Sequence, residues 1–173
     1  ATQNPVSMAG TYPLAEGVTD RFMAAVSLGR ANAAEEVDVL TGRRGRGRLD
    51  ELAQVATLDE LAECRGVVRD VHLAEAVAEY AVALLHATRA HPHVRLGAST
   101  RGGVAMVSLA KAFAVMAGRD FVAPHDLQRA ASSSLGHRLV LVVGHHHDAA
   151  GGDVCECGLD GVERAAHDAA STW

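Results

Sequence analysis

The amino-acid sequence predicts a mainly α-helical protein. Of its 173 residues, 49% are hydrophobic but only 3% are aromatic, so the core must consist largely of alanine, leucine and valine. A core of this composition favours helices that pack closely together. Helix start signals and apolar residues at helical spacing recur along most of the chain. We therefore expect a small bundle of helices.

Two helices are predicted before residue 43. Pro13 suits the first position of a helix that runs to about Phe22. Asn32 is followed three residues later by Glu35, a pattern in which two side chains cap a helix start reciprocally. We expect this second helix to end near Gly42.

Another capping box opens a third helix. Thr57 and Glu60 stand at the spacing that such a box requires. We expect Cys64, on the apolar face of this helix, to behave as a small buried hydrophobic residue. The residues that form this face are Leu58, Leu61, Cys64, Val68 and Val71.

Three further helices are predicted in the second half of the chain, over about 73–90, 99–117 and 124–144. Gly118 suits the left-handed position that follows a helix, and Pro124 suits a first helical position. For the helix over 99–117, the expected core face consists of Ala105, Leu109, Ala112, Phe113 and Met116. For the helix over 124–144, it consists of Leu127, Ala131, Ser134, Leu135 and Leu139.

The stretch 96–103 (Leu-Gly-Ala-Ser-Thr-Arg-Gly-Gly) is a candidate site. Ser99 suits the N-cap position of the helix that follows. Arg101 in the first turn opposes the helix dipole, and Gly102 and Gly103 weaken a helix interior. Several neighbouring residues that disfavour a helix suggest a functional role, and a helix start with an arginine suits the binding of a phosphate. A solvated arginine on a loosened turn remains the alternative.

Composition excludes several classes of protein. A net charge of −5 argues against a general nucleic-acid binder, because no basic field is present to release counterions. The basic run over 43–48 is better explained as a solvated loop, since no aromatic residues interleave with it. No apolar run approaches the ~18 residues of a membrane span. The three cysteines form no disulfide framework and fit a reducing compartment.

Neither a complete phosphate-binding loop nor a regular metal site is present in the sequence. The glycine-rich phosphate loop needs a lysine after glycine, whereas Lys111 stands between two alanines. The histidines over 145–147, with Cys155, Cys157 and His167, match no usual zinc framework. We expect no stoichiometric metal, and a poorly ordered tail over 144–173.

Five separated stretches resemble the MoxR family of AAA+ ATPases in order and spacing. They are residues 1–5 (Ala-Thr-Gln-Asn-Pro), 10–22, 87–92 (Ala-Thr-Arg-Ala-His-Pro), 96–101 and 118–126 (Gly-Arg-Asp-Phe-Val-Ala-Pro-His-Asp). The resemblance covers about residues 1–143. It implies a C-terminal part of such an ATPase, in which 1–28 is a short remnant of the α/β nucleotide-binding core, 29–143 is a helical lid domain and 144–173 is a tail.

The resemblance also implies roles for four residues. Asn4 corresponds to the sensor-1 residue that places the attacking water. Arg21 corresponds to the arginine finger that reaches the nucleotide of a neighbouring subunit. Arg101 corresponds to the sensor-2 arginine, which reaches from the lid to the nucleotide of its own subunit, with Ser99 beside it. The chain departs from the usual family pattern at Ala15, Thr19 and Thr100, and none of these changes removes a functional side chain.

The same resemblance implies cofactors and partners. A parent protein would bind ATP and Mg²⁺ through an upstream core that this chain lacks, assemble into a ring with six subunits as the expected number, and hydrolyse ATP. It would act in the cytoplasm on a client protein, with a von Willebrand A-type partner and without nucleic acid or membrane. We expect this chain alone not to hydrolyse ATP. A free-standing helical module, with Arg101 binding an acidic partner, is the alternative.

Overall fold

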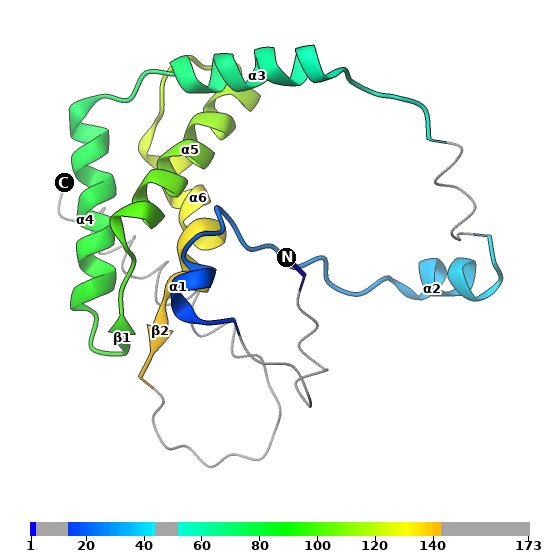
Figure 1. Cartoon of the computed structure of the whole chain (residues 1–173), viewed down its shortest axis with the longest axis horizontal. Coiled ribbons are helices and arrows are strands. Elements are labelled where there is room, and N and C mark those ends of the chain that lie inside the picture. Colours follow the sequence, from blue (N-terminus) through cyan, green and yellow to red (C-terminus); the bar gives the residue numbers. More distant parts are fainter. Residues whose placement is uncertain (3–13, 44–51, 143–173) are drawn as a thin grey trace. The chain divides into compact units, whose positions relative to one another are not determined.

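The computed structural model of the chain describes residues 1–2, 14–43 and 52–142 (Figure 1). Contacts divide the chain into two compact units, Ala1–Ala25 with Val68–Trp173, and Val26–Val67. Asn4, Pro13, most of the basic run over 43–48 and the whole tail with its histidines and cysteines lie outside the described residues.

The larger unit is a helical bundle, which confirms the predicted mainly α fold. Its main helices are α4 (Glu75–Ala90), α5 (Thr100–Met116) and α6 (Pro124–Leu135). The helix α5 packs along α6 and also contacts α4 (Figure 1). Because α5 touches both partners, its small side chains set how closely the three helices approach one another.

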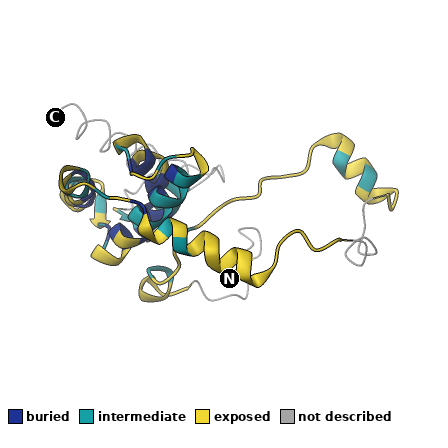
Figure 2. Cartoon of the chain, turned by 90° about the horizontal axis from the view of Figure 1, so that it is seen from above, coloured by how far each residue is buried: buried dark blue, intermediate teal, exposed yellow. Residues whose placement is uncertain are grey.

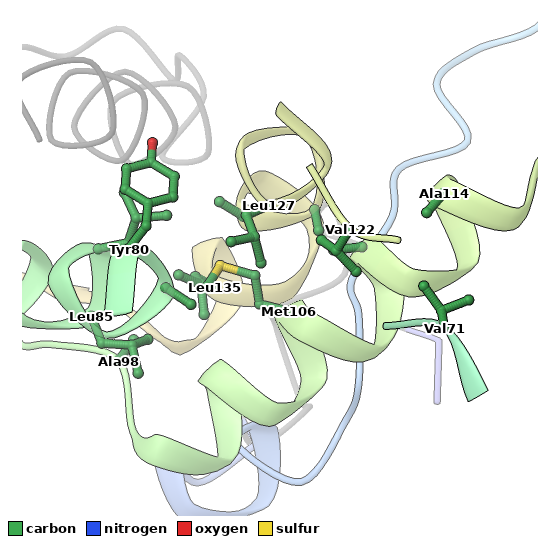
Figure 3. Close-up of a cluster of buried hydrophobic side chains, with 14 residues drawn as sticks. Val71, Tyr80, Leu85, Ala98, Met106, Ala114, Val122, Leu127 and Leu135 are labelled. Carbon is green, nitrogen blue, oxygen red and sulfur yellow. The ribbon is translucent and has the colours of Figure 1, made fainter. Parts of the chain in front are cut away.

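The core of this unit is aliphatic, as the low aromatic content predicts. Met106, Leu127 and Leu135 have no exposed surface, and Figure 3 shows them side by side between α5 and α6. Tyr80 lies at the edge of the cluster, where its hydroxyl accepts a hydrogen bond from Gln128 Nε2 at 3.0 Å. Burial of such side chains contributes about 1.5–3 kcal/mol each.

The buried face of α5 differs from the predicted one. Met116 is 77% exposed, and Leu109 and Phe113 are only partly buried at the rim of the core. The buried residues of the helix are mostly small: Gly102, Gly103, Ala105, Met106, Ala110 and Ala114. Hydrophobicity alone assigned the larger side chains to the core, whereas close packing against α4 and α6 needs small ones at the contact.

A short loop and strand connect α4 to α5. The backbone N–H of Ala98 donates to Thr88 Oγ1 at 3.0 Å, and the Ala98 carbonyl accepts from Arg89 Nε at 2.8 Å. Gly97 lies against Arg89, where an added Cβ would stand 2.6 Å from the Arg89 Cα. The last turn of α4 therefore fixes the backbone that immediately precedes α5.

A capped turn connects α5 to α6. Gly118 has φ +71°, and the N–H groups of Gly118 and Arg119 donate to carbonyls in the last turn of α5, which completes a Schellman motif. The two terminal nitrogens of Arg119 each lie 2.7 Å from an oxygen of Asp126. Hydrogen bonding from Arg119 holds the pKa of the Asp126 carboxyl below its ordinary value. Pro124 begins α6, as predicted.

The predicted helix over 124–144 is too long. After α6 ends at Leu135, the chain forms a 3₁₀ turn, η3 (Gly136–Arg138), and a short strand, β2 (Val140–Leu141). The strand pairs antiparallel with β1 (Val94–Leu96). Tertiary pairing with β1 overrides the helical continuation, because backbone groups that leave the helix find partners in the strand.

The smaller unit contains α2 (Ala33–Leu40) and most of α3 (Leu58–Asp70), whose last residues belong to the larger unit. Both predicted capping boxes form. Glu35 N–H donates to Asn32 Oδ1 at 3.0 Å, and Glu60 N–H donates to Thr57 Oγ1 at 3.2 Å. Neither helix has a buried residue (Figure 2), so the predicted burial of Cys64 is wrong. An apolar stripe defines a shared face but not whether another element covers it.

The described residues contain neither a membrane-spanning helix nor a metal-binding cluster. No helix among them is long and apolar enough to cross a membrane. No group of three or more histidine, cysteine or acidic side chains within the described ranges is arranged to hold a metal ion.

Gly97→Ala is expected to destabilise the chain by about 2 kcal/mol or more, because the new Cβ would overlap the backbone of Arg89. Gly17→Ala is the matched control: no atom lies within 4 Å of its added Cβ, so this variant should be neutral or slightly stabilising. Urea unfolding measures both. Equal stability of the two variants would contradict the close contact.

The Asp126–Arg119 pair predicts a pH dependence of stability. Because the pKa of Asp126 is lower in the folded state than in the unfolded state, its contribution is complete above the unfolded pKa of about 3.9. The contribution is lost as the pH falls through the folded pKa. Asp126→Asn should therefore cost about 3 kcal/mol near neutral pH and progressively less as the pH falls below about 3.9.

Urea unfolding as a function of pH measures the effect. Asp120→Asn, at an exposed position in the same turn, is the control and should change little. A cost of Asp126→Asn that stays constant across the pH range would show that the ion pair is not its origin.

Candidate functional site

The segment that carries Arg21 leaves helical structure early. The helix α1 (Glu16–Thr19) has four residues, and the chain beyond it is irregular. The helix predicted to reach Phe22 is therefore too long at its C-terminal end. Backbone groups of the segment 20–25 instead bond to α6 and η3 of the same unit.

Arg138, at the end of η3, is the main contact of this segment. Its side chain is 2% exposed, and its guanidinium donates to the carbonyl oxygens of Asp20 at 3.0 Å and Phe22 at 2.6 Å. It also donates to the carbonyls of Met23 and Ser134. Because arginine presents five donors in a rigid fork, one buried side chain can satisfy several carbonyls of an irregular loop.

Two more contacts hold the segment 20–25. His137 Nε2 lies 3.1 Å from the carbonyl oxygen of Phe22, and the N–H of Ala25 donates to the Ser133 carbonyl at 2.9 Å. Burial lowers the pKa of the His137 imidazole below its ordinary value, which favours the neutral ring. Apart from Asp20, the loop thus docks on α6 and η3 by its backbone rather than by its side chains.

The Asp20 carboxylate joins three elements. Its Oδ1 accepts from Ser99 Oγ at 2.7 Å and from Arg138 Nε at 3.2 Å. Its Oδ2 lies 3.4 Å from a terminal nitrogen of Arg101. The carboxylate therefore connects the segment that carries Arg21 to the start of α5 and to η3.

The two ion pairs of Asp20 differ in strength. The Arg101 side chain is 62% exposed, and exposed pairs contribute about 0–1 kcal/mol. The Arg138 side chain is buried and bonded to backbone carbonyls as well, so removal of one partner would leave groups unsatisfied at a cost of about 3–5 kcal/mol. The contact with Arg101 is therefore weak and exposed, whereas the contact with Arg138 is buried and structural.

The start of α5 is shaped by packing. Ser99 is the N-cap, as predicted, and its Oγ accepts from the N–H of Gly102 at 3.2 Å. An added Cβ at Gly102 would lie 3.1 Å from Arg138 Cδ, and one at Gly103 would lie 2.7 Å from Leu85 Cδ1. The presence of glycine at both positions therefore has a structural explanation: it leaves room for side chains of α4 and η3 to pack against the start of α5.

The structure brings two of the four predicted site residues together. Ser99 and Arg101 both contact Asp20, the residue that precedes Arg21. Arg21 itself is exposed, and Asn4 lies outside the described residues. Asp20 and Arg138 were not among the site residues predicted from the sequence. Asp20 stands next to Arg21 and could have been noticed there, but Arg138 has no local signal.

Comparisons with known proteins point to one family. The sequence profile described as the AAA lid domain matches residues 86–153. The chain is 38% identical over 141 residues to the uncharacterized protein YeaC of Bacillus subtilis. This alignment covers 82% of this chain and 44% of YeaC. It is 29% identical over 150 residues to the chaperone MoxR1 of Mycobacterium tuberculosis, covering 82% of this chain and 39% of MoxR1.

A solved structure agrees with these relatives. The crystal structure of a candidate ATPase from Cytophaga hutchinsonii superposes with a TM-score of 0.74 and 27% sequence identity, over 94% of this chain and 51% of the other. The chain is similar to the C-terminal part of a MoxR-like AAA+ ATPase. This MoxR-like chain spans less than half of the length of the two curated relatives.

The lid profile covers only part of the site in the MoxR-like chain. Its range, 86–153, includes Ser99, Arg101 and Arg138 but not Asp20 or Arg21. The contacts of Asp20 therefore join the lid to residues outside the matched lid range.

Arg138→Met is expected to destabilise the MoxR-like chain by about 3 kcal/mol, because the carbonyls of the segment 20–23 lose their donors and Asp20 loses its buried partner. Arg95→Met is the control. Arg95 pairs with Glu16 at 2.7 Å but is 60% exposed, so its loss should cost less than about 1 kcal/mol. Denaturant unfolding compares them, and an equally small cost for both would contradict the role of Arg138.

Proposed function

We propose that this chain supplies the lid and two arginines to the ATP-hydrolysing sites of a MoxR-like AAA+ protein, one arginine to its own site and one to a neighbour's. Arg21 acts as the arginine finger for the nucleotide of a neighbouring subunit. Arg101 acts as the sensor-2 arginine of the lid, for the nucleotide of its own subunit. The single observation that supports the proposal is that the loop carrying Arg21 and the helix start carrying Arg101 meet at one carboxylate, Asp20.

The two arginines suit the chemistry of phosphoryl transfer. Negative charge is distributed over the phosphoryl oxygens in the transition state, and guanidinium groups stabilise it. Arg21 and Arg101 are both exposed residues of the described chain. Arg101 contacts Asp20 at 3.4 Å, and in this proposal it exchanges that carboxylate for a phosphate. The donors therefore fit phosphate oxygens, and the buried Arg138 does not compete for this role.

The remaining parts of the site would lie upstream. The chain contains no glycine-rich loop followed by lysine, so ATP and Mg²⁺ would be bound by a core that residues 1–28 complete, with Asn4 as sensor 1. Residues 29–143 form the lid in this proposal. An arginine finger acts between subunits, so the proposal includes assembly into a ring, with six subunits as the expected number.

The biological role in this proposal is remodelling of a client protein in the cytoplasm. The relative MoxR1 is named a chaperone, which supports this role. Movement of the lid on hydrolysis would transmit work to the client. A von Willebrand A-type partner belongs to the same proposal.

Arg21→Ala and Arg101→Ala, made in the full-length protein that includes the upstream core, test the proposal. Loss of a finger is expected to lower kcat by about 10³-fold or more. Loss of the lid arginine is expected to lower kcat by about 10²-fold, since one preorganised donor is removed. Steady-state ATP hydrolysis measures both effects. Arg95→Ala, another exposed arginine of the same unit, is the control and should retain activity.

Mixing experiments separate the two roles. A subunit with Arg21→Ala should regain turnover when mixed with a subunit whose upstream phosphate loop is inactivated, because each supplies what the other lacks. A subunit with Arg101→Ala should not, since both defects then concern a subunit's own nucleotide. Turnover near wild type in either single variant would contradict its assignment and favour a helical interaction module.

A further inference from the structure

The Asp20 carboxylate has one secure side and one exchangeable side. On the secure side, Oδ1 contacts Ser99 Oγ at 2.7 Å and the buried Nε of Arg138 at 3.2 Å. The backbone carbonyl of Asp20 is also bound by Arg138, at 3.0 Å. On the exchangeable side, Oδ2 lies 3.4 Å from a terminal nitrogen of the exposed Arg101 side chain.

Charge makes Asp20 a competitor of phosphate. A carboxylate carries one negative charge, whereas the terminal phosphate of a nucleotide carries nearly two and offers three acceptor oxygens. Arginine binds either group through the same donors. A long, exposed arginine side chain can therefore leave the carboxylate for a phosphate, while the carboxylate stays with Ser99 and Arg138.

We propose that Asp20 is a positioning residue that holds Arg101 and yields it to a nucleotide phosphate, while the finger segment stays anchored through Arg138. The inference rests on the proposed function, because it takes Arg101 as a nucleotide-contacting residue. It adds that the occupancy of Arg101 is set by competition with a carboxylate of the finger segment. Nucleotide binding at the lid is thereby coupled to the residue that precedes Arg21.

The anchoring contacts explain why the competition leaves the finger in place. Phe22 and Met23 bond to Arg138 by their carbonyls, and Ala25 bonds to Ser133 by its N–H. None of these contacts involves Arg101. Release of Arg101 therefore changes the charge around Asp20 but removes no backbone contact of the segment that carries Arg21.

Asp20→Asn in the full-length protein tests the inference. The amide oxygen can still accept from Ser99 and Arg138, but the charge that holds Arg101 is lost. Binding of a non-hydrolysable ATP analogue should become about two- to fivefold tighter, as expected for loss of an exposed ion pair. Asp20→Ala also removes the acceptor and should lower kcat by tenfold or more. A purely structural residue would not produce this separation.

A double-mutant cycle and a charge control make the test specific. In the Arg101→Ala background, Asp20→Asn should leave the dissociation constant of the analogue unchanged. Glu16→Gln removes a carboxylate of the same segment that is bonded to Arg95 instead, and it should not tighten binding. If Asp20→Asn lowers the melting temperature, Asp20→Glu decides: a dissociation constant near wild type supports the inference, and a tightened one contradicts it.

The outcomes distinguish this inference from the proposed function. If Arg101→Ala weakens binding or slows turnover but Asp20→Asn does not tighten binding, the inference is wrong and the proposed function stands. Equal tightening by Asp20→Asn with and without Arg101 also overturns it, since the effect would then be general charge. If Arg101→Ala changes neither binding nor turnover, the proposed role of Arg101 and this inference both fall.

Discussion

The burial of Arg138 is the constraint on which the site depends. A guanidinium that is 2% exposed must satisfy its donors within the protein, and it does so on the carboxylate of Asp20 and on a set of backbone carbonyls. The irregular segment after α1 has no secondary structure of its own to satisfy those carbonyls. Each side therefore supplies what the other lacks, and the segment that carries Arg21 takes the conformation that Arg138 dictates.

Hydrogen bonds and close packing also fix the start of α5. Thr88 and Arg89, in the last turn of α4, form hydrogen bonds with the backbone of Ala98. Gly97 packs so closely against Arg89 that there is no space for a Cβ. The N-cap Ser99 follows at once and uses its hydroxyl twice, as acceptor for Gly102 N–H and as donor to Asp20. A strong network on one side and a weak, exposed contact on the other leave Arg101 as the part of the site that is free to change partner.

Local features of the fold were predictable from the sequence. The capping boxes at Asn32 and Thr57, the N-cap at Ser99 and the terminal Gly118 all involve groups within a few residues of one another, so their spacing contains the answer. The faces of the helices were less predictable. The buried face of α5 consists mostly of its small residues rather than its large apolar ones. Cys64 is exposed although it lies on an apolar face of α3, because periodicity does not state whether another element covers that face.

The sequence by itself determined the helical class, the helix starts at Asn32, Thr57, Ser99 and Pro124, the resemblance to MoxR-like proteins and the identity of Ser99, Arg21 and Arg101 as candidates. These depend on interactions between near neighbours or on motifs that stand in order along the chain. Only the tertiary structure decided that Asp20 and Arg138, 118 residues apart, form the centre of the site. Such a pair has no local signal, because a buried charge finds its partner only after the helices have packed.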